Sequence, residues 1–222
     1  MNLKKILILK KKNSKKFRTH FMWILKIGGS WIKNRHLDEL ICKLVKFKNE
    51  RIIIVTGGGC MADSVREIFK ATKMEECTGN FLALKATEIF GHLICQKSQH
   101  FATSESFNFV DDKLTIWLPS KKLQNEPTFE KNWNSTSDSV AMWLGKKLNS
   151  KGVIILKSLA FGLEKEYELK KLQKENILDK NIHKYFTKKN LLKIAGPEIL
   201  KYLALYNCWE KLASKCGKVV SN

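Results

Sequence analysis

Two apolar runs in this sequence each end in a glycine cluster that leads into a helix-like stretch. The first cluster lies in Lys26–Ser30, after the run Trp23–Leu25, and the second in Thr56–Gly59, after the run Ile52–Val55. Consecutive β-branched residues such as those of the second run are typical of strands buried on both faces of a parallel sheet. Glycines at a strand-to-helix turn let backbone N–H groups approach an anion, and the helix adds its positive end. The pair of turns predicts an α/β fold that holds two phosphate-like groups.

The rest of the chain alternates apolar runs with stretches of helical periodicity, the order expected for helices on both faces of a mainly parallel sheet. We expect strands at Trp23–Ile27, Arg51–Thr56, Phe107–Val110, Leu114–Leu118, Val153–Leu156, Leu191–Ala195 and, at the edge of the sheet, Lys218–Val220. We expect helices at Leu37–Lys48, Met61–Thr72, Asn80–Lys97, Ser137–Leu148, about 166–175, about 180–188 and 197–206, and a polar loop at 120–134. No repeat or linker interrupts this order, which favours a single domain over residues 22–222.

The net charge of +20 raises the question of a nucleic-acid partner. Eight of the 41 basic residues precede Met22, so the remainder of the chain carries 33 basic against 21 acidic residues. Only four of the basic residues are arginine, whereas bidentate phosphate and base recognition depends on arginine. We interpret the lysine excess as a composition bias that raises the local concentration of anionic substrates, and nucleic acid as the less favoured partner.

Residues 1–21 hold eight basic and no acidic side chains. We expect a basic, disordered N-terminal extension, with a poor targeting sequence or an extension upstream of a natural start at Met22 as alternatives. No apolar run reaches the roughly 18–20 residues that cross a bilayer, so no membrane span is expected. The six cysteines show no C-x-x-C pair and no zinc-like spacing, which favours reduced thiols and a cytoplasmic location.

The residues around the first glycine turn suit phosphoryl transfer. Lys26 ends the first strand two residues before the glycine pair, where its ammonium can neutralise a phosphoryl group that the turn holds. The backbone N–H groups of Gly28 and Gly29 and the hydroxyl of Ser30 add further donors. We predict Lys26 as a catalytic residue and the other three as nucleotide-binding, with an ordinary strand-end lysine as the alternative.

Asp138 is the main candidate for a catalytic carboxylate. It begins a predicted helix, where the helix dipole alone favours an acid. If it instead faces Lys26, it orients the ammonium and keeps it charged, or it contacts a magnesium ion, and we predict it as catalytic. Lys157 and Ser158 follow the strand Val153–Leu156 and are predicted to contact nucleotide phosphates, the alternative being a lone strand-end lysine.

The second glycine cluster is assigned to the acceptor. Gly57, Gly58 and Gly59 form the predicted anion site, with Asp63 and Arg66 in the first turns of the next helix; a tight turn without a ligand is the alternative. No Ser/His/Asp set offers a general base, but an acceptor oxygen that is already ionised, on a phosphate or a carboxylate, needs none. Lysines, glycine N–H groups and Mg²⁺ then suffice, which predicts an ATP- and Mg²⁺-dependent kinase with a small-molecule acceptor.

This pattern resembles the amino acid kinase superfamily, which includes acetylglutamate, aspartate, uridylate and isopentenyl phosphate kinases. The resemblance runs from about Trp23 to the C-terminus and is carried by Lys26–Ser30, Ile54–Gly59 with Ala62 and Asp63, Thr136–Ala141, and Ile154–Ser158. It implies a three-layer αβα sandwich around a mainly parallel open sheet, with ATP over the C-terminal half and the acceptor over the N-terminal half. It also implies that Lys26 stabilises the transferred phosphoryl group and that Asp138 organises the catalytic lysines.

Within the superfamily, the short chain with Trp133 and Ala141–Leu144 is most similar to the compact branch of [5-(aminomethyl)furan-3-yl]methyl phosphate kinases of methanofuran-type cofactor synthesis. That similarity implies a phosphate monoester as acceptor and a diphosphate as product. A homo-oligomer, dimeric or higher, is also expected. A non-catalytic relative that binds nucleotide or anions, and a basic nucleic-acid-binding protein, stay open as alternatives.

Overall fold

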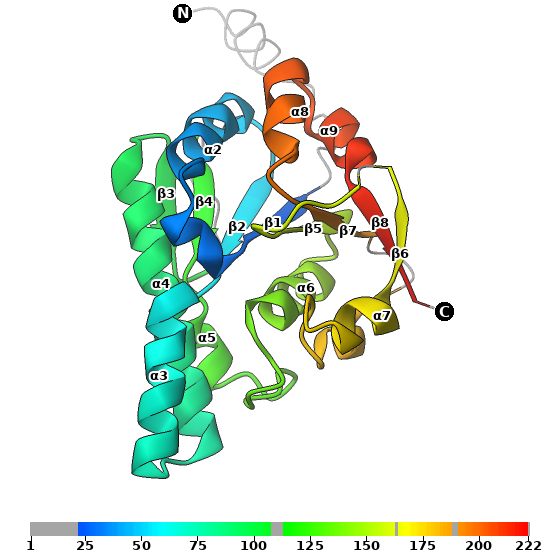
Figure 1. Cartoon of the computed structure of the whole chain (residues 1–222). Coiled ribbons are helices and arrows are strands. Elements are labelled where there is room, and N and C mark those ends of the chain that lie inside the picture. The colour runs from blue at the N-terminus through cyan, green and yellow to red at the C-terminus, as the bar shows by residue number, and fades with distance from the viewer. Residues whose placement is uncertain (1–21, 108–112, 163, 188–190, 222) are drawn as a thin grey trace, which may run out of the picture.

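The computed structural model describes residues 22–107, 113–162, 164–187 and 191–221 (Figure 1). Within them, eight strands form one sheet in the order β3-β4-β2-β1-β5-β7-β8-β6. The neighbouring strands pair in parallel, apart from the antiparallel pair β7–β8. The strands are β1 (Trp23–Ile27), β2 (Ile52–Thr56), β3 (Phe101–Ser104), β4 (Leu114–Trp117), β5 (Gly152–Leu156), β6 (Glu166–Glu168), β7 (Leu191–Ala195) and β8 (Gly217–Val220).

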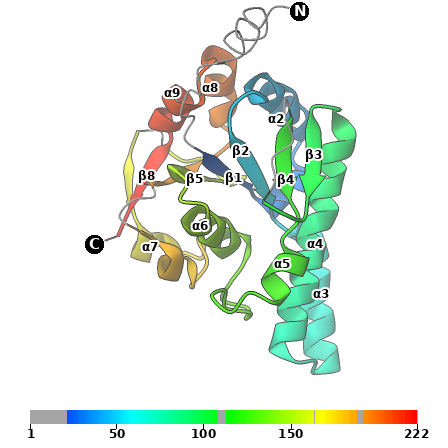
Figure 2. The ribbon, with the colours of Figure 1, turned by 180° about the vertical axis from the view of Figure 1, so that it is seen from behind.

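Helices cover both faces of this sheet, which makes three layers and confirms the predicted α/β sandwich (Figures 1 and 2). Helices α2, α8 and α9 lie on one face, and α6 and α7 lie on the other. The long pair α3 and α4 runs along the β4 side and projects beyond the sheet. The α-helices are α2 (Leu37–Leu44), α3 (Gly59–Thr72), α4 (Glu76–Lys97), α5 (Ser120–Gln124), α6 (Ser137–Lys147), α7 (Leu169–Lys174), α8 (Ile199–Leu205) and α9 (Trp209–Lys215), and the 3₁₀ turns are η1 (Gly29–Lys33), η2 (Val45–Phe47) and η3 (Ile182–Tyr185).

The strand alternation divides the apolar side chains into two cores. On β1, Leu25 packs in the core that includes α2, α8 and α9, whereas Ile24 packs in the core that includes α6 and α7. Since side chains alternate along a strand, Lys26 faces the same layer as Ile24, the layer of α6. The register of β1 thus directs this lysine toward the predicted helix of Asp138.

The central strand β1 marks a topological switch point. The chain continues from β1 to β2 on one side of it and reaches β5 on the other side only later. Because β1, β2 and β5 are parallel, their carboxyl ends meet at one edge of the sheet, and ligands of open α/β sheets bind outside that edge at the switch point. The turns that follow these three strands carry most of the predicted site residues.

Short elements with little burial account for the errors of the sequence prediction. The strand β3 was missed because only its first residue, Phe101, is buried. Residues 166–168 were predicted as helix but form the edge strand β6, an exposed Glu-Tyr-Glu segment that pairs with β8; β8 is therefore not the edge. The predicted strand Phe107–Val110 lies largely outside the described residues.

Three further predictions also need correction. The predicted loop at 120–134 contains the short helix α5, and the predicted helix at 180–188 contains only the 3₁₀ turn η3. The helix α9 was not predicted, because its seven residues give only one apolar turn, Trp209, Leu212 and Ala213. The predicted basic extension, residues 1–21, lies outside the described residues.

Two predictions from composition can be compared with the structure. In the part of the chain that the structure describes, no helix is both long and apolar enough to span a bilayer. All six cysteines are free, as expected for reduced thiols.

Candidate active site

The two glycine turns touch each other at the carboxyl edge of the sheet. A Cβ atom built on Gly29 would lie 2.0 Å from the backbone nitrogen of Gly59, and one on Gly57 would lie 2.4 Å from the nitrogen of Gly29. Gly59 also has a φ of +52°, a conformation that favours glycine. The backbone N–H of Gly57 donates to the carbonyl of Ile27 at 2.8 Å, which ties the second turn to the end of β1. The turns after β1 and β2 therefore form one double turn that has no room for side chains.

A buried carboxylate lies between two lysine ammonium groups beside this double turn. Lys26 Nζ is 2.8 Å from Asp138 Oδ1, and Lys157 Nζ is 2.7 Å from Asp138 Oδ2. Lys26 and Asp138 are only 4% and 2% exposed, and Lys157 is more open to solvent. The predicted contact between Asp138 and Lys26 is confirmed, and Lys157 joins it from the end of β5. Each carboxylate oxygen faces one ammonium, so this Lys-Asp-Lys cluster carries a net charge of about +1 when all three groups are ionised.

Burial and mutual attraction set the charge of the cluster. Burial lowers the pKa of Lys26 to about 8, although the Asp138 carboxylate acts in the opposite direction. For Asp138, burial favours the neutral acid, but the charges of Lys157 and Lys26 together outweigh it and lower its pKa to about 2. Asp138 is therefore ionised at neutral pH, and Lys26 is an ammonium that loses its proton far more readily than an exposed lysine.

A second buried acid, Asp179, holds the start of α6 and thereby places Asp138. Its Oδ2 accepts hydrogen bonds from the backbone N–H groups of Thr136 and Ser139, both at 2.8 Å, and its Oδ1 accepts from the N–H of Ile182 at 2.9 Å. The hydroxyls of Thr136 and Ser139 donate to it as well. Burial, followed by the charge of Asp138, raises the pKa of Asp179. Sequence reasoning missed this residue, since it follows α7 in a polar segment with no motif.

The residues predicted to bind nucleotide meet where β1 and β5 end. The hydroxyls of Ser30 and Ser158 lie 2.7 Å apart, and the N–H of Gly28 donates to the carbonyl of Leu156 at 2.8 Å. Lys157 and Asp138 line a cavity of about 270 Å³ whose other wall is the segment 176–180. This cavity lies against the C-terminal half of the sheet, the half predicted to hold ATP.

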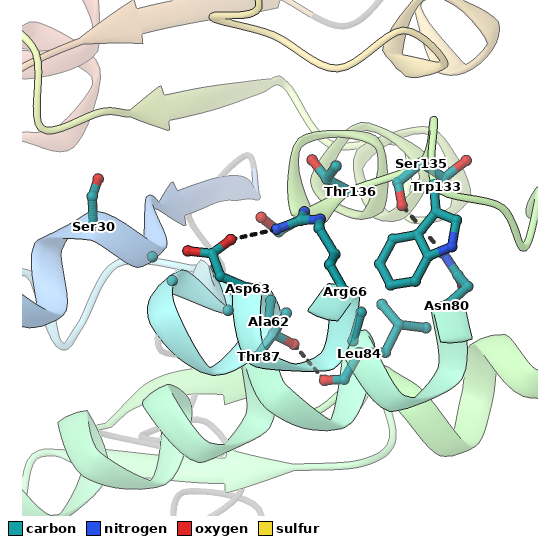
Figure 3. Close-up of a pocket in the computed structure, with 16 residues that line it drawn as sticks. Ser30, Ala62, Asp63, Arg66, Asn80, Leu84, Thr87, Trp133, Ser135 and Thr136 are labelled. Atoms are coloured by element: carbon teal, nitrogen blue, oxygen red, sulfur yellow. Dashed lines mark hydrogen bonds and ion pairs between the residues drawn. The ribbon is translucent and has the colours of Figure 1, made fainter. Parts of the chain in front are cut away.

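The residues predicted to bind the acceptor line a second cavity of about 170 Å³ (Figure 3). Its floor is the double turn, and its walls come from α3, α4 and the segment 133–137. Arg66 Nη1 lies 2.6 Å from Asp63 Oδ1, and its guanidinium stands 5.6 Å from the ring of Trp133. A guanidinium has five N–H donors, so the pair with Asp63 leaves several for an anion. Gly29 and Ser30, predicted for the nucleotide, line this cavity too, and Trp133 and Thr136 line both.

A dedicated metal cage is not found in the described part of the chain. No group of three or more His, Cys, Asp or Glu side chains comes together there. Both oxygens of Asp138 face lysines, which leaves this carboxylate poorly suited as a metal ligand. A magnesium ion that arrives on nucleotide phosphates needs few protein ligands, so this finding is compatible with Mg²⁺ bound to a nucleotide.

Comparisons with known proteins find one relative that is similar in sequence and solved structures that are similar in architecture. No protein-family model matches the chain. The [5-(aminomethyl)furan-3-yl]methyl phosphate kinase of Methanocaldococcus jannaschii is 33% identical over 139 residues, a match that covers 60% of this chain and 64% of that protein, just under two thirds of its length. The UMP kinase of Ureaplasma parvum superposes with a TM-score of 0.63 at 14% identity, covering 90% of this chain and 98% of the other. The chain has the amino acid kinase fold.

The uridylate kinase of Archaeoglobus fulgidus leads to the same assignment, with a TM-score of 0.62, 13% identity, and coverage of 90% of this chain and 100% of the other. These likenesses confirm the resemblance to the amino acid kinase superfamily and to its compact branch. Within the amino acid kinase fold, the Lys-Asp-Lys cluster lies at the switch point. Asp138 and Lys157 line the cavity of about 270 Å³, and Ser137, the neighbour of Asp138, lines the cavity of about 170 Å³.

Proposed function

We propose that this protein is an ATP-dependent kinase that transfers the γ-phosphoryl group to an acceptor oxygen already ionised at neutral pH. The observation that carries the proposal is the Lys26–Asp138–Lys157 cluster: Asp138 and Lys157 line one cavity, and Lys26 directly precedes the double turn that forms the floor of the other. Burying charges is costly, and a protein that only bound anions would need the glycine turns but not this cluster. The spread of lysines without arginine clusters likewise offers little to a nucleic acid.

In the proposed reaction the chain supplies alignment and charge neutralisation. Nucleotide phosphates lie in the cavity beside Lys157, the acceptor lies over the double turn, and the γ-phosphoryl group passes between them past Lys26. The two ammonium groups neutralise charge on the transferred group, and the glycine N–H groups hold its oxygens. Asp138 acts as a positioning residue that fixes both lysines. No side chain has to remove a proton, because the attacking oxygen is ionised before transfer.

The cofactors of the proposal are ATP and Mg²⁺. Bound to nucleotide phosphates, Mg²⁺ would neutralise part of their negative charge. Lys157 and the residues of the first turn, Gly28 to Ser30, would contact the same phosphates, and we assign no carboxylate of this chain to the metal.

We propose a phosphate monoester as the acceptor. The relative from Methanocaldococcus jannaschii is named for such a compound, [5-(aminomethyl)furan-3-yl]methyl phosphate. Arg66 and the double turn offer the donors that a phosphate dianion needs. A role in methanofuran-type cofactor biosynthesis is part of this proposal, and a carboxylate acceptor is the alternative.

A phosphotransfer assay tests the function. With ATP and Mg²⁺, we expect formation of ADP and a diphosphate from phosphate monoesters, and no transfer to acidic amino acids. Lys157→Met is expected to slow transfer on the order of a hundredfold or more, since one preorganised charge is lost. Lys151→Met is the matched control, because this lysine flanks the other end of β5 and pairs with Glu210. Equal rates for the two variants would contradict the kinase proposal, whereas transfer to acidic amino acids alone would replace the phosphate monoester by the carboxylate alternative.

The rate should depend on pH through Lys26. Its pKa is lowered to about 8 by burial and the ammonium is the active form, so kcat/KM is expected to fall roughly tenfold per pH unit above pH 8. Bound phosphates favour the ammonium, so kcat should fall only at higher pH. Asp138, with a pKa of about 2, adds no acid limb above that value. Initial rates of ADP formation between about pH 6 and pH 10 measure both profiles; a kcat/KM that stays level up to the upper limit would be inconsistent with this role.

We also propose a homo-oligomer and a cytoplasmic location. Leu82, Ile89 and Leu93 form one exposed apolar stripe on α4, with exposures of 36%, 54% and 36%. A second copy of the chain would cover such a stripe. The six free cysteines suit a reducing compartment.

A further inference from the structure

Two asparagines on opposite sides of the candidate site hold the same short loop. The loop runs from residue 132 to residue 135, carries Trp133 and leads directly into α6. On the acceptor side, the amide of Asn80 in α4 donates to the carbonyls of Asn132 and Ser135 at 2.9 and 3.3 Å. On the other side, the amide of Asn181 donates to Asn132 Oδ1 and Ser135 Oγ, both at 2.9 Å.

The two bonds of Asn80 leave its own oxygen without a donor. Because the NH₂ group must face the two carbonyls, the orientation of the amide is fixed, and Oδ1 is the remaining group. Asn80 is 3% exposed, and its Oδ1 has no hydrogen-bond donor among the described residues. The residue lines the acceptor cavity and also a neighbouring cavity of about 320 Å³ between α4 and α5. A buried acceptor without a donor is unfavourable, and here it lies where a ligand can complete the bonding.

The indole of Trp133 lies over Asn80 in the close-up of the cavity (Figure 3). Its ring packs edge-on against Phe69, with centroids 5.1 Å apart, and stands under the guanidinium of Arg66. Gly79 makes room for it, because a Cβ there would lie 2.8 Å from Trp133 Cζ2. The indole N–H is also buried without an acceptor among the described residues. No side-chain hydrogen bond of the described residues holds the ring, so its contacts with Phe69 and Arg66 are what a ligand has to displace to reach Asn80.

We propose that Asn80 and Trp133 form the specificity element of the acceptor site. Once the indole moves aside, Asn80 Oδ1 accepts a hydrogen bond from a hydroxyl or amino group on the organic part of the acceptor. This inference rests on the proposed function and narrows its substrate class to phosphate monoesters whose organic group carries a hydrogen-bond donor. The second cavity, lined by the apolar Phe81, Leu84 and Leu123, provides space for a ring or short chain beyond Asn80.

Three benzyl phosphates that differ only at the meta position test the inference. One carries a hydroxymethyl group, one an aminomethyl group, and one an ethyl group of similar size without a donor. By calorimetry, the unaltered protein is expected to bind the first two on the order of tenfold or more tightly than the third. Asn80→Leu should lose this preference, whereas Asn181→Ala should keep it, because Asn181 holds the same loop but does not line the acceptor cavity.

The outcomes separate the inference from the proposed function. General damage to the loop would weaken all three probes equally, so only a lost preference identifies the oxygen of Asn80. Binding should also change the tryptophan fluorescence, and Trp133→Phe should remove that change. If the unaltered protein binds and phosphorylates all three probes equally, the inference is overturned and the kinase proposal stands. If it neither binds nor phosphorylates any probe, both fail. The comparison on the unaltered protein holds even if Asn80→Leu does not fold.

Discussion

Lys26→Met is expected to lower kcat by three orders of magnitude or more while the fold persists. The ammonium lies 2.8 Å from Asp138 Oδ1 and beside the double turn, where charge develops in the proposed phosphoryl transfer. Removing a preorganised donor from such a site typically costs on the order of 10² to 10³ in rate, and here a full charge is lost from a buried position. Methionine has a similar volume and removes a buried ammonium whose pKa is already lowered to about 8 by burial, so the cost in stability should be small.

Single-turnover rates and thermal unfolding separate these two effects. We expect the melting temperature of Lys26→Met to stay within a few degrees of the unaltered protein, and nucleotide binding to survive, because Lys157 still pairs with Asp138 at 2.7 Å. Lys151→Met, at the opposite end of β5, serves as the control for loss of one positive charge. A rate within about tenfold of the unaltered protein would remove Lys26 from the chemistry.

Local patterns explain why the sequence could predict the central part of this site. Consecutive apolar residues predict buried strands such as Ile52–Thr56. The glycines that follow these strands are predicted to form tight turns. The structure adds the reason for these glycines, since each turn takes the space that a Cβ of the other would need. Lys26 and Lys157 could be placed because one lies near the end of an evident strand and the other directly follows one.

The parts that could not be predicted depend on contacts between distant segments. Asp179 bonds to Thr136 and Ser139 some 40 residues earlier, and nothing in its polar neighbourhood points to α6. No sequence pattern predicts a role for Asn181 either, because its hydrogen bonds to the loop at 132–135 depend on the folded structure. The edge strand β6 depends on backbone pairing with β8, and the Glu-Tyr-Glu sequence of β6 does not itself predict a strand. The contact of Asp138 with Lys26 was expected as one alternative, and only the packing of α6 under β1 decides it.

The double turn itself should tolerate no side chain, and Gly29→Ala is the sharpest test of that. The added Cβ would lie 2.0 Å from Gly59 N, 2.6 Å from Gly59 Cα and 3.0 Å from Gly57 C, all backbone atoms that cannot rotate away. The two turns must therefore separate, and we expect a loss of about 3–5 kcal/mol in the free energy of unfolding, together with loss of phosphoryl transfer.

Gly162→Ala is the matched control for this change. Its Cβ would also come within 2.5 Å of another atom, but that atom belongs to the flexible side chain of Lys165, which can move. We expect this variant to unfold within about 1 kcal/mol of the unaltered protein and to keep its transfer rate. Urea titrations of both variants give the comparison. A loss for Gly29→Ala as small as that expected for Gly162→Ala would mean that the turns after β1 and β2 can separate without harm. The alignment of the two phosphate groups in the proposed reaction would then not depend on direct contact between these turns.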